Sequence, residues 1–274
     1  MGAKPVLAAL AFAAFPPHCE TPAWLASATD SARAGFARER GVAPDPLRAT
    51  APPPLPRSIR MEPLAPEVDV TAAPPTFVMR GEPHGPHKLV FIHGMCGHAL
   101  GYAQSFQWSA AKHGVLVAPQ GDVPCSPGSP WAKWSLDTNA LDARILTAFR
   151  ALGSPEPVTD ITLIGYSQGA SRAEALARRW PKRYTRLILI AGPSKVSPYG
   201  LSVQSALMMA GTLDRQDLMQ ASARAFSAAG RRARYMSLPN ARHGAMGDTP
   251  EQTMSAALDW LYERPPSPPT VAVD

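Results

Sequence analysis

The chain has 274 residues, an ordinary apolar content and a formal net charge of +6. This length is enough for one sizeable domain with appended segments. The basic residues are scattered without interleaved aromatic side chains, which argues against nucleic-acid binding, and no apolar run is long enough for a stable membrane span.

The first residues have the features of a secretory signal. Lys4 supplies a positive charge, an apolar run follows from Val6 to Phe15, and a small-x-small cleavage pattern occurs at residues 26–28. We therefore expect residues 1–28 to be a signal peptide and the protein to be exported, either periplasmic or secreted. The alternative is an Ala-rich leader on a cytoplasmic protein.

Prolines are concentrated in two segments. Of the 31 prolines, ten lie between Ala43 and Pro75 and five between Pro250 and Pro269. Because dense proline disfavours packed helices and sheets, we expect residues 29–75 to be a largely disordered leader or linker and residues 264–274 to be a disordered tail. The folded domain is predicted over residues 76–263.

From Thr76 onward, short apolar runs alternate with segments of helical spacing. This alternation predicts an α/β domain with a mostly parallel sheet and helices on both faces, and in such domains sites form at the carboxyl ends of the strands. Strands are expected at Thr76–Met79, Lys88–Ile92, Val115–Ala118, Ile161–Ile164, Leu187–Ile190, Ala206–Ala210 and Ala233–Ser237, and helices at Ala99–Lys112, Leu136–Leu152, Ala170–Arg179, Arg215–Ala229 and Gln252–Tyr262.

The most informative motif is Gly165-x-Ser167-x-Gly169, which lies between a predicted strand and a predicted helix. This context is typical of a nucleophile elbow, in which a strained turn projects the serine from the sheet edge. The two glycines remove Cβ atoms that would clash in such a turn. We therefore expect Ser167 to be a catalytic nucleophile.

A serine nucleophile needs a base, and the base needs a carboxylate to orient it. His243 is the one histidine that follows Ser167 in the sequence, and it lies just after the last predicted strand. Gly211-Thr212-Leu213-Asp214 directly follows the Ala206–Ala210 strand, and Asp214 is the expected acid. Asp217 is the alternative, and Asp214 could instead, or in addition, cap the following helix.

An oxyanion hole requires backbone donors. Gln168, at the start of the elbow helix, is expected to supply one amide, and Met95, in the loop after the Lys88–Ile92 strand, the other. His93 ends that buried strand, and we expect it to have a structural hydrogen-bonding role.

Removal of a signal peptide would leave two cysteines, Cys96 and Cys125, each after a predicted strand at the same end of the sheet. A disulfide between them is feasible in an oxidising compartment, whereas in the cytosol two free thiols are expected. Neither cysteine has a metal-binding spacing, and the His84/His87 pair is interpreted as part of a solvated turn. No metal and no cofactor are expected.

Taken together, Ser167, Asp214 and His243 in that chain order, with His93-Gly94 and the elbow motif, resemble the α/β-hydrolase superfamily. The resemblance spans about residues 76–263 and implies the α/β-hydrolase fold and serine chemistry. Within the superfamily, the core is similar to the dienelactone-hydrolase and phospholipase/carboxylesterase-like groups. It departs from the hormone-sensitive-lipase type of esterase, because it has no His-Gly-Gly-Gly motif.

Only residues Gly192 to Ser205 connect the strands between which many relatives insert a cap domain, so we expect an open site without a large cap. Trp131, Trp134 and Tyr166 are candidate substrate-binding residues, although the tryptophans could equally cover the core beneath a long loop. Arg172 and Lys195 could offer a cation to an acidic substrate.

The expected function is hydrolysis of a small ester or acyl substrate, as in a carboxylesterase, through an acyl-enzyme on Ser167. A serine peptidase similar to the prolyl-oligopeptidase catalytic domain is one alternative, although the chain lacks that family's propeller. A non-catalytic binding protein on a degenerate hydrolase fold is another, and it would be expected to lack a triad residue.

Overall fold

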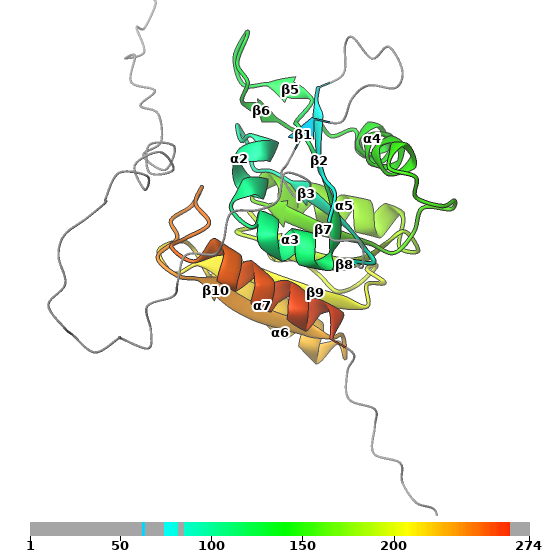
Figure 1. Ribbon diagram of the computed structural model, residues 1–274. Helices are drawn as coiled ribbons and strands as arrows, with labels where there is room; N and C mark the ends of the chain where they lie inside the picture. The colour runs from blue at the N-terminus through cyan, green and yellow to red at the C-terminus, as the bar shows by residue number, and fades with distance from the viewer. Residues whose placement is uncertain (1–61, 64–73, 82–84, 264–274) are drawn as a thin grey trace, which may run out of the picture. The chain divides into compact units, whose positions relative to one another are not determined.

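The computed structural model describes residues 62–63, 74–81 and 85–263 (Figure 1). The expected signal peptide, the C-terminal tail and nearly all of the expected leader, as well as His84, lie outside these ranges.

In the described part of the chain, eight strands form one mostly parallel sheet (Figure 1). The sheet order is β1-β2-β4-β3-β7-β8-β9-β10, in which β1 pairs antiparallel with β2 and β2 pairs antiparallel with β4. All the other pairs are parallel. The strands are β1 (Glu62–Pro63), β2 (Thr76–Met79), β3 (His87–Ile92), β4 (Gly114–Pro119), β7 (Ile161–Tyr166), β8 (Tyr184–Ile190), β9 (Ser205–Gly211) and β10 (Ala233–Leu238).

Helices cover both faces of this sheet. The described helices are α2 (Ala99–Gln104), α3 (Gln107–His113), α4 (Thr138–Ala151), α5 (Gln168–Arg179), α6 (Asp217–Ala228) and α7 (Pro250–Tyr262). Side chains of α4, α5 and α6 pack into one buried cluster, and those of α2, α3 and α7 into another. The prediction of a parallel sheet with helices on both faces is confirmed.

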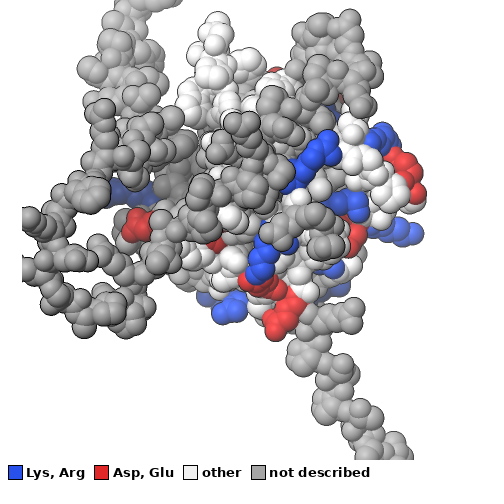
Figure 2. Space-filling model, viewed as in Figure 1, with Lys and Arg blue, Asp and Glu red and all other residues white. Residues whose placement is uncertain are grey.

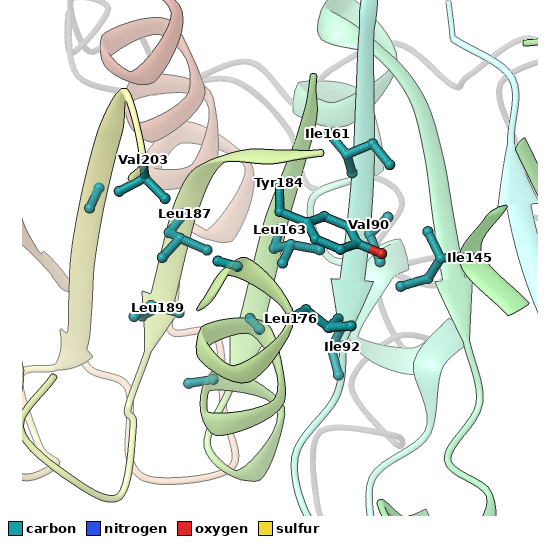
Figure 3. Close-up of a cluster of buried hydrophobic side chains, with 14 of the residues drawn as sticks. Val90, Ile92, Ile145, Ile161, Leu163, Leu176, Tyr184, Leu187, Leu189 and Val203 are labelled. Atoms are coloured by element: carbon teal, nitrogen blue, oxygen red, sulfur yellow. The ribbon is translucent and has the colours of Figure 1, made fainter. Parts of the chain in front are cut away.

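Strand alternation divides the core between the two faces. In β3, Val90 and Ile92 belong to the cluster under α4, α5 and α6 (Figure 3), whereas Leu89 and Phe91 belong to the other. Successive side chains of a strand point to opposite faces, so a strand that is buried on both sides has a continuous apolar sequence. Replacing one such fully buried large apolar residue by alanine lowers the free energy of unfolding by about 2–5 kcal/mol.

The predicted helix over Ala99–Lys112 is two helices, because the chain breaks at Ser105 and Phe106. The Ser105 hydroxyl donates to the Tyr102 carbonyl at 2.7 Å, and such side-chain bonds compete with helical ones. Phe106 leaves the helical conformation and buries its ring against Phe91, with 5.5 Å between the ring centroids.

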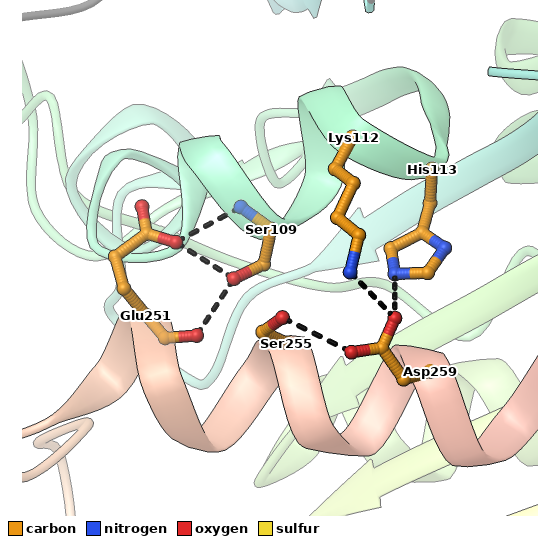
Figure 4. Close-up of polar contacts among 6 residues, drawn as sticks. All are labelled: Ser109, Lys112, His113, Glu251, Ser255 and Asp259. Atoms are coloured by element: carbon orange, nitrogen blue, oxygen red, sulfur yellow. Dashed lines mark hydrogen bonds and ion pairs between the residues drawn. The ribbon is translucent and has the colours of Figure 1, made fainter. Parts of the chain in front are cut away.

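The second of these helices, α3, receives its N-terminal cap from α7 (Figure 4). The carboxylate of Glu251 accepts the amide N–H groups of Trp108 and Ser109 at 2.8 and 2.9 Å. At the other end of α3, Lys112 donates to Asp259 at 2.9 Å. Because the first amides of a helix lack internal partners, this carboxylate from another element stabilises α3.

Two short features complete the architecture near the carboxyl ends of the strands. A two-stranded hairpin, β5 (Val123–Pro124) with β6 (Ala132–Lys133), forms between β4 and α4. Between β8 and β9, residues 191–204 contain no helix or strand, so the described chain carries no cap domain there, as predicted. Among the described helices, none has the length and apolarity needed to cross a bilayer.

Candidate active site

The elbow, residues 165–169, is a sharp turn between β7 and α5. Ser167 has a φ of 50°, in the left-handed region that costs a non-glycine residue about 1–3 kcal/mol. Its amide donates to the Ile190 carbonyl at 2.8 Å, which holds the turn against β8. A Cβ atom at Gly165 would lie 2.5 Å from the Gly169 carbonyl oxygen, and one at Gly169 would lie 2.0 Å from the Ile92 carbonyl oxygen. The turn therefore requires both glycines.

Ser167, His243 and Asp214 form one chain of hydrogen bonds. The Ser167 hydroxyl lies 3.0 Å from His243 Nε2, and His243 Nδ1 lies 2.8 Å from Asp214 Oδ2. With Nδ1–H donating to the carboxylate, Nε2 is left to accept the hydroxyl proton. The Asp214 side chain is 12% exposed and that of His243 54%, so the histidine is open to solvent while its carboxylate partner is shielded.

Asp217 lies outside this chain of hydrogen bonds. Its side chain is largely exposed and pairs with Arg215 at 3.4 Å. It is the first residue of α6, whose N-cap position is occupied by Gln216. Asp214 therefore does not cap that helix, and its second oxygen accepts the Arg215 amide at 2.7 Å.

The two amides expected to form an oxyanion hole belong to residues close to Ser167. Gln168 follows Ser167 directly, and Met95 follows Gly94, where a Cβ atom would lie 3.3 Å from Ser167 Cβ. Within the described residues, neither amide N–H donates to another protein group. Both donors are therefore available to a group bound beside Ser167.

His93 is fully buried and uses both ring nitrogens. Nδ1–H donates to the Gly94 carbonyl at 2.7 Å, and Nε2 accepts the Gly121 amide at 2.8 Å. Burial lowers the pKa of His93 to about 4, so the ring is neutral near pH 7. These contacts match the structural role expected of it, and they tie the loop after β3 to the loop after β4.

Of the three candidate substrate-binding aromatics, two are buried. Trp134 donates its indole N–H to the His93 carbonyl at 2.7 Å, and its backbone is held by the Gln168 side chain. Tyr166 lies in the last position of β7 and is 2% exposed. Only Trp131 is partly exposed, with its ring edge-on to His98 at 5.9 Å. Burial indicates that Trp134 and Tyr166 support the site rather than line its surface.

The loop carrying Met95 is fastened to the β5–β6 hairpin. Cys96 and Cys125 form a disulfide, with 5.7 Å between their Cα atoms. Gly97 exchanges two backbone hydrogen bonds of 3.1 Å with Ala132. The cross-link and the bridge restrict the backbone on the carboxyl side of Met95.

Three large apolar side chains close in sequence to these groups are exposed. Met95 is 63% exposed, Leu136 81% and Leu213 57%. Leu213 precedes Asp214, Leu136 is two residues from Trp134, and Met95 follows Gly94, whose backbone approaches Ser167. Arg172 donates to the Ser135 carbonyl at 3.2 Å, while Lys195 is exposed in the segment after β8. On the described surface visible in Figure 2, basic and acidic side chains are interspersed.

The described residues contain no cluster of three His, Cys, Asp or Glu side chains able to hold a metal ion. His87, the described member of the His84/His87 pair, stacks on Tyr262 with 3.5 Å between the ring centroids.

Comparison with known proteins gives structural matches only. No protein-family model matches the sequence. No curated protein matches it either.

Three solved structures illustrate the likeness, each covered almost completely by this chain. A carboxylesterase from Mesorhizobium loti superposes with a TM-score of 0.54 at 18% identity, over 73% of this chain and 98% of that one. Esterase PE8 superposes with a TM-score of 0.52 at 22% identity, over 69% of this chain and 98% of that one. The fluorophosphonate-binding serine hydrolase F of Staphylococcus aureus superposes with a TM-score of 0.53 at 12% identity, over 74% of this chain and 98% of that one.

At these identities the likeness concerns the fold. The three matches cover 69–74% of this chain, which is much of its sheet-and-helix domain. The chain therefore has the α/β-hydrolase fold.

Proposed function

We propose that this protein is a serine hydrolase that cleaves carboxylic esters through an acyl-enzyme on Ser167. The observation that carries the proposal is the hydrogen-bond chain from Asp214 through His243 to a serine in a strained elbow. Nothing in the packing of the core requires these three polar side chains to meet, whereas nucleophilic catalysis requires this arrangement.

In the proposed reaction, Ser167 Oγ attacks the ester carbonyl carbon while its proton passes to His243 Nε2. The carbonyl oxygen becomes an oxyanion, which accepts hydrogen bonds from the free backbone N–H groups of Met95 and Gln168. Collapse of this intermediate breaks the bond to the alcohol oxygen, which takes the proton from His243. Water then attacks the acyl-enzyme, His243 accepts its proton and returns it to Ser167, and the carboxylic acid leaves.

Esters are favoured as substrates by two observations. The structural neighbours include proteins described as a carboxylesterase and an esterase. In addition, Met95, Leu136 and Leu213, each close in sequence to a candidate site residue, have exposed apolar side chains, and residues 191–204 of the described chain contain no helix or strand that could form a cap. An acyl group with an apolar chain fits such surroundings.

The proposal is tested with a fluorophosphonate probe and a short-chain nitrophenyl ester. Wild-type protein should label and hydrolyse, while Ser167→Ala and His243→Ala should each lose on the order of 10⁴-fold or more in kcat/KM. Ser171→Ala is the matched control, because Ser171 lies one turn further along α5 and makes no hydrogen bond through its side chain within the described structure. Hydrolysis that survives Ser167→Ala would exclude this mechanism, and a wild type that neither labels nor hydrolyses would favour the binding-protein alternative.

A further inference from the structure

Two tyrosine hydroxyls hold the backbone immediately after His243. The Gly244 amide donates to the Tyr166 hydroxyl at 2.7 Å, and that hydroxyl is 3.4 Å from the Ala245 carbonyl, to which it donates. The Tyr102 hydroxyl donates to the Gly244 carbonyl at 3.1 Å. Both polar groups of Gly244 are therefore bonded to side chains from β7 and α2.

These bonds anchor one side of the histidine loop, residues 239–248. On the amino side of His243, the Ala241 carbonyl accepts the Leu213 amide at 3.0 Å, and the Asn240 amide donates to Thr212 at 2.8 Å. On the carboxyl side, the Gly244–Ala245 backbone bonds to other elements through the two tyrosine hydroxyls. Gly244 itself has a φ of 92°, so it occupies a conformation that the hydroxyls help to define.

Packing of the two tyrosine rings holds these hydroxyls in place. Tyr102 and Tyr166 pack against each other with 5.1 Å between the ring centroids, and Tyr166 lies 5.8 Å from the His243 ring. Burial raises the pKa of both tyrosines, so each hydroxyl keeps the proton with which it donates. Tyr166 is thus a buried, protonated group that touches the loop and not the solvent.

We propose that Tyr166 and Tyr102 are positioning residues, whose hydroxyls hold Gly244 so that the His243 imidazole lies between Asp214 and Ser167. The inference rests on the proposed function, since it assigns the pair a role in the same reaction. Further along the loop, Met246 is buried in the core and the Asp248 amide donates to the Pro239 carbonyl at 3.2 Å, but the two hydroxyls hold the backbone directly after His243. Without them, that backbone could shift and move the ring away from its contacts of 2.8 and 3.0 Å. Displacements of about 1 Å in such arrangements can cost on the order of 100-fold in rate.

The test uses Tyr166→Phe and Tyr102→Phe in the full chain, with Tyr262→Phe as the matched control. Tyr262 is a largely buried tyrosine whose hydroxyl bonds to Thr162, near the opposite end of β7. Tyr166→Phe should lower kcat and the fluorophosphonate labelling rate by about 10- to 100-fold while KM changes little. Tyr262→Phe should cause a similar shift in Tm without a comparable loss of rate.

A double-variant cycle identifies the group through which the tyrosine acts. Adding Tyr166→Phe to His243→Ala should produce no further loss, because the hydroxyl acts only through the histidine. A further loss in that background would overturn the proposal, since it would show a direct contribution to the reacting groups. Labelling of Tyr166→Phe at the wild-type rate would overturn it as well.

A spectroscopic measurement separates this inference from the proposed function. With ¹⁵N-labelled histidine, the ring signals of His243 in the wild type should correspond to one tautomer, with the proton on Nδ1. In Tyr166→Phe they should broaden or move toward the average of the two tautomers. If the wild type does not label but these signals still change, the proposed function fails and the positioning role stands. Unchanged ring signals would overturn the positioning role.

Discussion

At the scale of single residues, the site combines groups that are strained, neutral or shielded for separate reasons. Ser167 is held in a left-handed conformation by the helix and strands around it, and His93 is neutral because it is buried. Neither feature stabilises the fold by itself. Ser167 places its hydroxyl at the turn after β7, and His93 ties the loop after β3 to the loop after β4.

The elbow predicts a steric limit at Gly169. A Cβ atom there would lie 2.0 Å from the Ile92 carbonyl oxygen, so Gly169→Ala must displace backbone that carries the nucleophile. We expect a stability loss of about 2 kcal/mol or more and the loss of fluorophosphonate labelling. Gly153→Ala is a useful comparison, because Gly153 has open space around it but a φ of 77°. Its cost should be confined to backbone strain, with labelling retained. Normal labelling of Gly169→Ala would contradict the close packing of the elbow.

His93 predicts a pH dependence of stability. Its pKa of about 4 in the folded protein lies below the ordinary value of 6.5, so the unfolded chain binds more protons between these values. The free energy of unfolding should therefore fall as the pH drops from 6.5 toward 4, by on the order of 3 kcal/mol from this residue. Urea unfolding at pH 7 and pH 4.5 measures the total fall, to which His87, His98 and His113 also contribute because burial lowers their pKa values. An NMR titration isolates His93 and shows whether its ring stays neutral to about pH 4. Titration of His93 near pH 6.5 would contradict the burial argument.

At the scale of elements, the short helix α3 depends on a partner distant in sequence. Its seven residues are too few for an isolated helix to be stable in water. Glu251 of α7 accepts two of its first amides, and it also accepts the Ser109 hydroxyl at 2.7 Å. The two helices therefore form together, and the cap cannot be identified from the local sequence of α3.

We expect Glu251→Ala to lower the free energy of unfolding by about 1–3 kcal/mol, because it leaves two partly buried amides without their acceptor. Thermal and urea unfolding measure this change. Gln252→Ala, at the exposed next position of α7, should stay within about 0.5 kcal/mol of wild type. Ester hydrolysis per folded molecule should be unchanged in both variants, since α7 contributes none of the triad. A Glu251→Ala variant with the wild-type free energy of unfolding would show that the cap adds nothing to stability.

At the scale of the whole molecule, the sheet collects groups that are far apart in the chain. Ser167 and His243 are separated by 76 positions and Asp214 and His243 by 29, yet all three follow strands at the same edge. The disulfide, which spans 29 positions, adds a covalent link at that edge. We propose that it forms because the protein is exported, with residues 1–28 removed as a signal peptide.

Export and the cross-link can be tested together. The intact mass of protein purified from its native compartment should match a chain beginning near residue 29 with Cys96 and Cys125 oxidised. Cys96→Ser/Cys125→Ser should lower stability by about 3–4 kcal/mol in the chain-entropy description of a loop of this length. Reductant should lower the Tm of the wild type but not of the double variant. A full-length cytosolic chain with free thiols would contradict the proposal of export.

The sequence singled out the three residues that the structure brings together, because Ser167 forms the turn after β7 and Asp214 and His243 lie in the loops after β9 and β10. It placed Tyr166 among the substrate-binding candidates and left Trp134 open between the site and the core, since aromatic residues near a strand end can face either; both are buried. Tyr166 shares a face of β7 with Ile164, and this two-residue alternation is the signal that could have indicated its burial. Tyr102, in a helix 64 positions before Tyr166, offered no comparable signal.

The sequence by itself determined the alternation of strands and helices, the elbow at Ser167 and the order of the acid and the histidine, because these depend on local apolar runs, turns and glycines. Only the tertiary structure decided the distances within the triad, the cap that α3 takes from α7, the pairing of Cys96 with Cys125 and the two tyrosines beneath the histidine loop. These depend on which segments the sheet brings side by side, and packing between distant segments leaves no periodic pattern in the chain.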